Sequence, residues 1–276
     1  MDLYLTEIAK RRIEPNFWCS REYLRTIRAE ERLHGSKVWL VDFEGEILFP
    51  VIDTETEEGL TAWTPDDRPV WSDFRWPRPF DFSPGWVPEK LDREFIYNPI
   101  KFLDLSGGCW KVFRKNVRKW PRRTKDKGGL PHYLRIGPGE STRGIELLLL
   151  SWIEDIGEKK IHDSSALVEL CLKANNRAVL YIEHSRGRLL AGLNVWDYSP
   201  GGRANFRYSI ARPHQPFLSD YLRLQFYTDP RVWSVTREVN DGGCLDCPGL
   251  EAYKLKLNPI STRWVRSWSK EKNNEG

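Results

Sequence analysis

The stretch LSGGCWKVFRKNVRKW, residues 105–120, combines a regular apolar spacing with a high density of basic residues. Its large apolar residues recur every three or four positions, as on one face of an α-helix, at Trp110, Phe113, Val117 and Trp120. The spacing predicts an amphipathic helix with a buried stripe. Ser106 is a residue type that caps helix starts, and Pro121 disfavours helical geometry at the residue before it. We therefore expect Ser106 to cap this helix and the helix to end close to Pro121.

The predicted helix and the residues after it are strongly basic. Nine Lys and Arg residues and one acidic residue, Asp126, lie between Lys111 and Lys127, which gives this segment a net charge of +8. The whole chain has 43 basic and 39 acidic residues, a net charge of +4, so the remaining residues sum to −4. Four side chains on the flanks and outer face are candidates for binding phosphate groups: Arg114, Lys115, Arg118 and Lys119. The alternative is a solvated helix face. Residues 122–127 are expected to form a mobile solvated tail.

Length and composition limit the number of domains and the class of protein. The 276 residues allow one large domain or two smaller ones, and 40% hydrophobic residues indicate a globular protein. The N-terminal stretch MDLYLTEIAKRRIEP has acidic residues among its apolar ones and no small-residue cleavage site, unlike a targeting segment. The longest apolar run, Ile145–Ile153, is shorter than the roughly 20 residues that cross a bilayer. We expect a soluble, cytoplasmic protein without a membrane span.

Five cysteines, an odd number, fit a reducing compartment better than a disulfide scaffold. Cys244 and Cys247 form a CLDC pair, which is half of a zinc site, a redox pair, or two thiols in a turn. A tetrahedral zinc site needs two further ligands, and the other cysteines and the five histidines are isolated from one another. A thioredoxin-like pair starts a helix directly after a strand, whereas here NDGG precedes the pair. We favour two thiols in a turn and expect no metal site.

Tryptophan is unusually common, with 13 residues. Four of them lie in residues 62–88 together with six of the 18 prolines: Trp63, Trp71, Trp76 and Trp86. So many prolines disfavour regular structure, which predicts a long ordered loop held down by its aromatic rings. The rings either stack on nucleobases or cover the core, and we favour the core.

The remaining patterns predict an α+β fold. Before residue 105 we expect a helix over 21–34 and two strands within 37–52, around Glu44-Gly45. After the basic helix we expect a strand at 132–136 and helices over 144–156 and 164–174. Residues 177–211 read as three antiparallel strands turning at Arg186-Gly187 and Gly201-Gly202. A helix over 217–229, a strand at 231–239, a short helix and a last extended piece follow. Helices leading into an antiparallel meander are typical of this fold class.

This element order is also that of the GNAT acyltransferase fold. In that fold a hairpin like LYIEHSRGRLLAGLNVW, residues 180–196, forms the central strands, and the next helix receives the cofactor's pyrophosphate at its N-terminus. Here the corresponding turn is ARPHQPFLSD, residues 211–220, with Arg212, His214 and Gln215 before the helix. It lacks the Gly-rich Arg/Gln loop of ordinary acetyl-CoA users.

Two stretches narrow the resemblance. Residues 93–120, REFIYNPIKFLDLSGGCWKVFRKNVRKW, resemble the segment of phosphatidylglycerol lysyltransferase C-terminal-like domains in which a Tyr-containing strand leads to L-S-G and a basic helix. Residues 237–259, REVNDGGCLDCPGLEAYKLKLNP, resemble the closing motif of those domains and of the Fem aminoacyl transferases. Its fixed positions are occupied by Gly249, Leu250, Lys254 and Pro259. The resemblance implies a tandem GNAT-like architecture of mixed, largely antiparallel sheets flanked by helices, with 1–104 as a degenerate first half and 105–276 as the transferase domain.

The resemblance also implies transfer of an acyl or aminoacyl group to an amine or hydroxyl. In the Fem relatives the donor is an aminoacyl-tRNA, and the Lys of the closing motif, here Lys254, helps to hold its terminal phosphate region. Lys254 is therefore a candidate catalytic residue, whose ammonium neutralises a phosphate or stabilises the oxyanion that forms as the ester is attacked. The alternative is an exposed helix residue. We expect no tightly bound cofactor, and an acyl-CoA or an aminoacyl-tRNA as the donor. From their placement on the fold, Asp241 and Glu183 are candidate general bases and Tyr208 a candidate proton donor. The alternatives are a turn-forming residue for Asp241, an exposed strand residue for Glu183 and a core residue for Tyr208. Asn240 and Arg212 are further candidates for substrate contacts.

Two alternatives stay open. One is an enzyme of the same fold whose acceptor is a base in DNA, as in some phage-encoded modification enzymes. The other is a non-catalytic protein that keeps the fold and binds tRNA or DNA, for which a sequence pI near 8.7 and abundant Trp and Arg are suitable.

Overall fold

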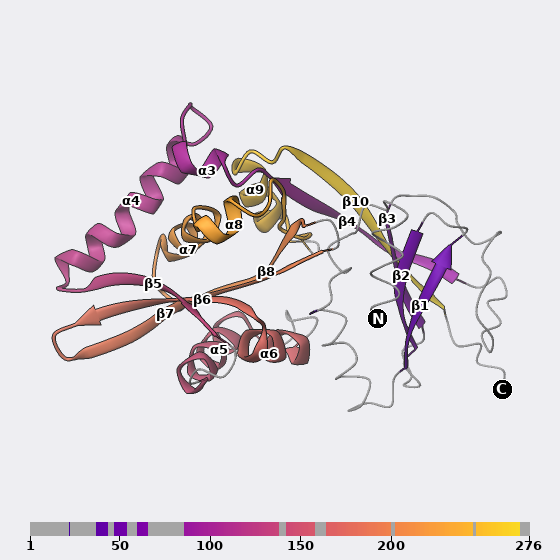
Figure 1. Ribbon diagram of the computed structural model, residues 1–276, viewed down its shortest axis with the longest axis horizontal. Helices are drawn as coiled ribbons and strands as arrows, with labels where there is room; N and C mark the ends of the chain where they lie inside the picture. The colour runs from indigo at the N-terminus through magenta and orange to yellow at the C-terminus, as the bar shows by residue number, and fades with distance from the viewer. Residues whose placement is uncertain are drawn as a thin grey trace.

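The computed structural model describes residues 22, 37–43, 47–53, 60–65, 86–137, 142–157, 164–199, 202–244 and 247–270. Its described strands form one ten-stranded sheet in the order β1-β2-β3-β10-β4-β9-β8-β7-β6-β5 (Figure 1). The strands are β1 Lys37–Phe43, β2 Ile47–Asp53, β3 Leu60–Pro65, β4 Trp86–Tyr97, β5 Leu130–Ile136, β6 Asn176–His184, β7 Gly187–Tyr198, β8 Ala204–Ala211, β9 Val239–Asn240 and β10 Ser261–Lys270. Neighbouring described strands pair antiparallel, except that β8 and β9 run parallel.

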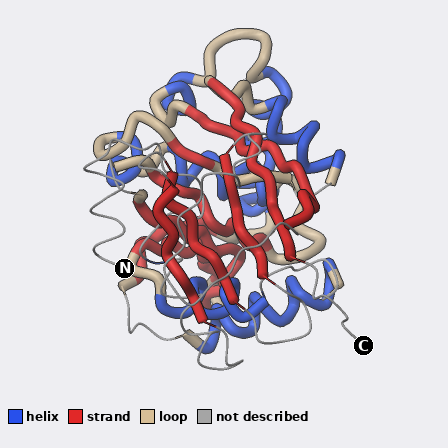
Figure 2. Tube along the Cα trace, turned by 90° about the vertical axis from the view of Figure 1, so that its right-hand side faces the viewer, coloured by secondary structure: helices blue, strands red, loops and turns tan. Residues whose placement is uncertain are grey.

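Helices cover both faces of the β5–β9 part of the sheet. They are α3 Lys101–Asp104, α4 Lys111–Asp126, α5 Arg143–Ile156, α6 Ser164–Lys173, α7 Leu218–Tyr227, α8 Pro230–Trp233 and α9 Pro248–Lys256. Figure 1 shows α4, α7, α8 and α9 on one face and α5 and α6 on the other, and Figure 2 views the same layers from the β1–β3 end. Separate apolar clusters fill the two sides, one built around Phe102, Phe206 and Phe226 and the other around Leu148 and Leu193.

The basic helix forms with the predicted buried stripe. Trp110, Phe113, Val117 and Trp120 are all buried, and the Trp110 ring lies 4.8 Å from the ring of Phe102 on α3. The predicted end at Pro121 was wrong, because α4 continues to Asp126 with Pro121 inside it. Burial of Thr124, one turn beyond Trp120, extends the apolar stripe past the proline, and its hydroxyl donates to the Trp120 carbonyl at 3.0 Å. Residues 122–126, expected as a mobile tail, are therefore helical.

The predicted cap of this helix was also wrong. The residue before the first turn is Trp110, and no side chain caps that end. Ser106 lies four residues earlier, in the turn between α3 and α4.

Most other predicted elements are confirmed, including the β6–β7–β8 meander and the β1–β2 hairpin, where Phe43 pairs with Ile47. The strand predicted at 231–239 was wrong. Pro230 at the first helical position and the Asp229 carboxylate, which accepts from the Arg231 amide at 2.9 Å, start helix α8 instead, and only Val239–Asn240 is extended.

The first 104 residues are described in part. The Trp/Pro loop predicted over 62–88 was wrong at both ends, because residues 62–65, with Trp63, belong to β3 and residues 86–88, with Trp86, belong to β4. Trp71, Trp76 and nearly all of the predicted helix 21–34 lie outside the described residues. The division at residue 104 stays a prediction; β10, from the C-terminal end, pairs with both β3 and β4.

Candidate functional site

The L-S-G turn between α3 and α4 has a backbone that side chains hold in place. Leu105 and Gly107 both adopt positive φ angles, 52° and 90°. The Arg114 guanidinium, one turn into α4, donates to the Leu105 carbonyl and to the Gly107 carbonyl at 3.0 Å. Arg114 therefore fixes the turn that positions α4 against α3.

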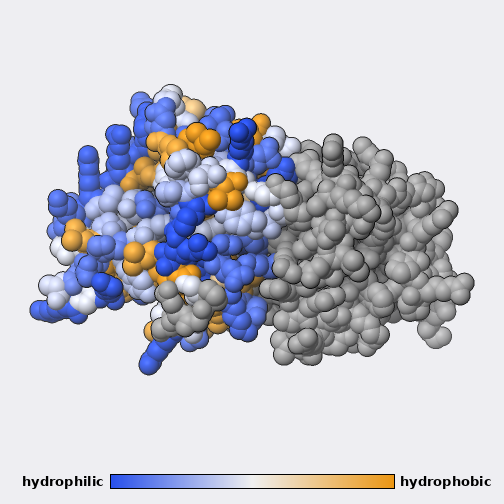
Figure 3. Space-filling model, viewed as in Figure 1, coloured by the Kyte–Doolittle hydropathy of each residue, from blue (hydrophilic) through white to orange (hydrophobic). Residues whose placement is uncertain are grey.

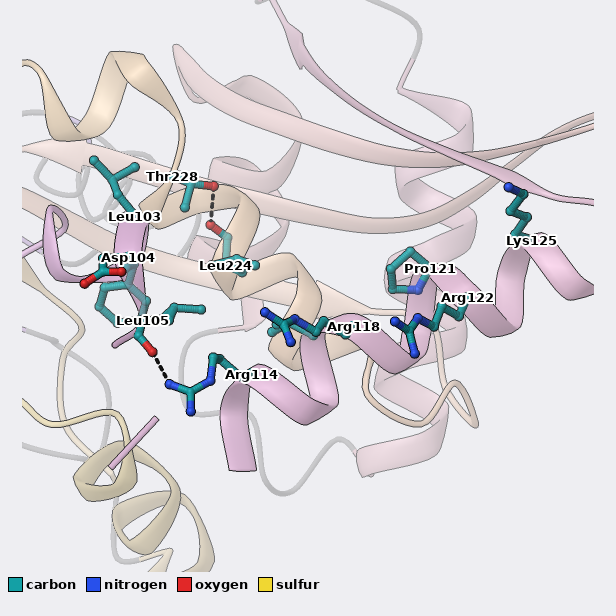
Figure 4. A pocket seen from close by; sticks show the side chains of 12 residues that line it. Leu103, Asp104, Leu105, Arg114, Arg118, Pro121, Arg122, Lys125, Leu224 and Thr228 are labelled. Atoms are coloured by element: carbon teal, nitrogen blue, oxygen red, sulfur yellow. Dashed lines mark hydrogen bonds between the residues drawn. The ribbon is translucent and has the colours of Figure 1, made fainter. Parts of the chain in front are cut away.

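A groove of about 550 Å³ lies between α3, α4 and α7 (Figure 4). Its apolar lining comes from Phe102, Leu103, Leu105, Val117, Pro121 and Leu224, and its polar lining from Asp104, Arg114, Arg118, Arg122, Lys125 and Thr228. The volume is in the range of small-molecule and cofactor sites. The groove thus has a hydrophobic wall beside a cationic edge.

The cations of the groove follow one side of α4. Arg114, Arg118 and Arg122 are four residues apart and Lys125 follows three later, so they share a helix face. At 1.5 Å of rise per residue they extend over about 16 Å. Figure 4 shows the three guanidinium groups along the same edge of the helix, and hydrophilic residues dominate the surface over α4 in Figure 3. Among the described lining residues Asp104 is the acidic one, so the edge attracts anions.

Two of the four predicted phosphate contacts line the groove. Arg114 and Arg118 line the groove, whereas Lys115 and Lys119 are absent from its described lining. The Lys119 ammonium lies 4.8 Å from the centre of the Phe217 ring, toward α7. Arg122 and Lys125 were missed, because the helix was expected to end before them. Their signal in the sequence is the basic spacing of three and four residues that continues through the proline.

Lys254 and Asp241, two predicted catalytic residues, lie together in a buried polar cluster. The Lys254 ammonium donates to the carbonyls of Asp241, Gly242 and Gly243 at 2.5, 3.2 and 2.7 Å, and lies 3.3 Å from the Asp241 carboxylate. Arg223 on α7 pairs with the same carboxylate, and the Tyr227 hydroxyl donates to it at 3.0 Å. This closing-turn cluster, Asp241–Gly243 with Lys254, Arg223 and Tyr227, ties α9 to α7. Catalytic roles for its members stay predictions.

Asn240 precedes this cluster and is also buried. Its side-chain Nδ2 donates to the Glu94 carboxylate at 2.8 Å, and its side-chain Oδ1 accepts from the Gly242 backbone amide at 2.9 Å. Both contacts hold the turn, so in this conformation Asn240 orders the backbone between β9 and α9.

The other predicted site residues lie elsewhere. Glu183 is near the end of the β6–β7 hairpin, half-exposed, with His132 at 3.0 Å and Arg188 at 3.3 Å. Tyr208 packs with the apolar cluster under α5 and α6, on the face opposite Lys254. Arg212 donates from Nε to the Leu190 carbonyl at 3.2 Å. The structure therefore does not bring Glu183, Tyr208 or Arg212 to the closing-turn cluster.

The N-terminus of α7, where the GNAT resemblance places a pyrophosphate, holds a carboxylate of the chain itself. Asp220 in the first turn is buried and accepts from the Asn116 amide at 2.8 Å and from the Tyr253 hydroxyl at 2.7 Å. Burial raises the pKa of the Tyr253 hydroxyl, which keeps it a donor. A fixed carboxylate compensates the positive end of the helix, which makes this end less attractive to a second anion.

Within the part of the chain that the structure describes, no group of three or more His, Cys, Asp or Glu side chains could hold a metal ion. Within the same residues, no helix combines the length and the apolar character that crossing a membrane requires.

No protein-family model and no curated protein sequence matches the chain, but solved structures share its fold. A conserved protein of unknown function from Bacteroides thetaiotaomicron matches with a TM-score of 0.69 at 12% identity, over 98% of this chain and 96% of that one. L-PGS from Bacillus licheniformis matches with a TM-score of 0.53 at 13% identity, over 91% and 93%. FemX matches with a TM-score of 0.56 at 8% identity, over 98% and 96%. The chain therefore has the GNAT-type fold of L-PGS and FemX, as the resemblance of the two sequence motifs implied.

Proposed function

We propose that this protein transfers an acyl or aminoacyl group from a phosphate-bearing donor to an amine or hydroxyl acceptor, and that the α4 groove binds the donor. The observation that carries the proposal is the row of Arg118, Arg122 and Lys125 beside an apolar wall. Guanidinium groups bind phosphate oxygens through paired, charge-assisted hydrogen bonds, and an apolar wall accepts the face of a base or another flat group.

The local charge at α7 favours the α4 groove, and not the N-terminus of α7, as the phosphate site. Asp220 already occupies the positive end of α7, whereas the cationic edge of α4 faces solvent with three exposed side chains. Phosphate binding is favoured where cations gather without a fixed counter-charge. The donors to be considered are an aminoacyl-tRNA, as the Fem resemblance implies, and an acyl-CoA. We place the reaction in the cytoplasm, where both kinds of donor are made.

A transfer assay tests the proposal. The purified chain is incubated with tRNAs carrying labelled amino acids, or with labelled acyl-CoAs, in the presence of amine and hydroxyl acceptors. We expect donor-dependent labelling of an acceptor, with a raised KM for the donor in the variant Arg118→Gln/Arg122→Gln. The matched control Lys111→Gln/Lys115→Gln removes the same charge from exposed positions of α4 outside the groove and should keep the wild-type KM. The absence of both binding and turnover with every donor tested would overturn the proposal.

One observation favours the alternative of a non-catalytic nucleic-acid-binding protein. Lys254 and Asp241 are buried, and the Lys254 ammonium donates a hydrogen bond to the Asp241 carbonyl. Neither residue is among the described residues that line the groove. That alternative predicts tRNA or DNA binding that depends on Arg118 and Arg122 without any transfer. Labelling of DNA in the same assay would instead identify a base in DNA as the acceptor.

A further inference from the structure

A backbone hydrogen bond joins the two cysteines of the CLDC pair. The Cys247 amide donates to the Cys244 carbonyl at 2.9 Å. Residues three apart that are joined in this way have Cα atoms within about 7 Å of each other, and the Cα atoms of disulfides are usually about 4.4–6.8 Å apart. The separation of the two backbones is thus compatible with a disulfide between residues 244 and 247.

The two thiols differ in access to solvent. Cys247 is exposed and is the residue before the first turn of α9, whereas Cys244 is buried in the apolar cluster that contains Phe95 and Tyr97. A dissolved oxidant reaches the exposed thiol first, and the buried thiol is then the nearest one to resolve the product. An exposed attacking thiol beside a second, resolving thiol is the usual arrangement of reversible redox sites.

The segment around the pair is anchored at both ends to the same helix. The Lys254 ammonium, on α9, holds the carbonyls of residues 241–243 directly before Cys244, and Cys247 leads directly into α9. Cys244 and Cys247 therefore both adjoin backbone that is fixed to α9.

The other two described cysteines lie on other elements. Cys171 is fully buried on α6, on the opposite face of the sheet, and burial raises the pKa of its thiol. Cys109 lies in the turn before α4.

We propose that Cys244 and Cys247 are a reversible thiol–disulfide site that reacts with a small disulfide of the glutathione class. The Cys247 thiolate attacks one sulfur of oxidised glutathione, forms a mixed disulfide and releases one glutathione thiolate. The Cys244 thiolate then attacks the Cys247 sulfur, forms the intrachain disulfide and releases the second glutathione. The protein loses two electrons and two protons, and the small disulfide is reduced to two thiols.

Incubation of the reduced, full-length chain with oxidised glutathione, followed by alkylation and peptide mapping, tests this site. We expect Cys244 and Cys247 in one intrachain disulfide that dithiothreitol reverses. Cys244→Ser should trap the mixed disulfide on Cys247, and the exposed substitution Cys247→Ser should slow the reaction of Cys244 on the order of tenfold, because that thiol is buried. A mixed disulfide that persists on Cys247 in the wild type, or a bond from Cys247 to another cysteine, would overturn the proposal. Transfer activity is not part of the readout, so this result is independent of the proposed function.

Discussion

Replacing Lys254 with methionine should destabilise the protein, because the ammonium holds a buried turn. The side chain is 5% exposed and binds three carbonyls and one carboxylate. Removing one partner of a buried ion pair costs about 3–5 kcal/mol, since the remaining groups stay desolvated. Arg223 still pairs with Asp241, so we expect the lower end, about 3 kcal/mol. At about 2–4 °C per kcal/mol for a chain of this size, Tm should fall by about 6–12 °C.

Thermal unfolding followed by tryptophan fluorescence measures this change. Lys256→Met is the matched control, because Lys256 is exposed on the same helix and its loss should change stability by no more than about 0.5 kcal/mol. A Lys254→Met protein with the wild-type Tm but without transfer activity would refute the structural role and favour the substrate contact that the closing motif implies.

Three further changes probe the packing. Pro121→Ala should raise the free energy of unfolding by about 2–3 kcal/mol, because it restores a helix hydrogen bond, and a lower urea midpoint would contradict this. Gly192→Ala should cost about 1–3 kcal/mol, because its Cβ would collide with the Leu222 side chain; a thermal midpoint equal to that of the wild type would contradict this and show that the Leu222 side chain moves aside at little cost. Burial raises the pKa of Tyr227 in the folded protein. Its neutral phenol therefore contributes fully to the free energy of unfolding below the unfolded-chain pKa of about 10, and this contribution is lost as the pH rises above that value. Tyr227→Phe should flatten the alkaline fall in stability, and phenolate absorbance from Tyr227 near pH 10 in the folded protein would contradict this.

The sequence predicted those elements that carry a local signal. The spacing of Trp110, Phe113, Val117 and Trp120 predicted the buried face of α4, and the glycine turns at 186–187 and 201–202 predicted the β6–β7–β8 meander. The proline rule failed at residue 121, because α4 continues to Asp126 and buries Thr124 one turn beyond Trp120, despite a local proline penalty of about 3 kcal/mol. A short stretch of sequence does not show such tertiary packing.

The candidate site was predictable only in part. The basic helix was identified, but which of its cations share a groove depends on where α3 and α7 lie, and Arg122 and Lys125 were therefore missed. Asp241 was a candidate from its placement on the fold, and no motif marked it. The closing motif marked Lys254 but did not predict its contact with Asp241. It could not show that the ammonium turns inward to backbone carbonyls, because a lysine on a short helix has the same sequence pattern when it is exposed.

The salt dependence of tRNA binding tests the groove most directly. Each phosphate contact adds about 0.7–0.9 to the slope of log affinity against log salt, so three contacts contribute about 2 or slightly more. Arg118→Gln/Arg122→Gln/Lys125→Gln should lower the slope by that amount. The control Lys111→Gln/Lys115→Gln/Lys127→Gln removes equal charge from exposed positions outside the described groove lining and should change the slope much less. Equal slopes for the wild type and the groove variant, or an equal fall in the control, would contradict phosphate binding in this groove.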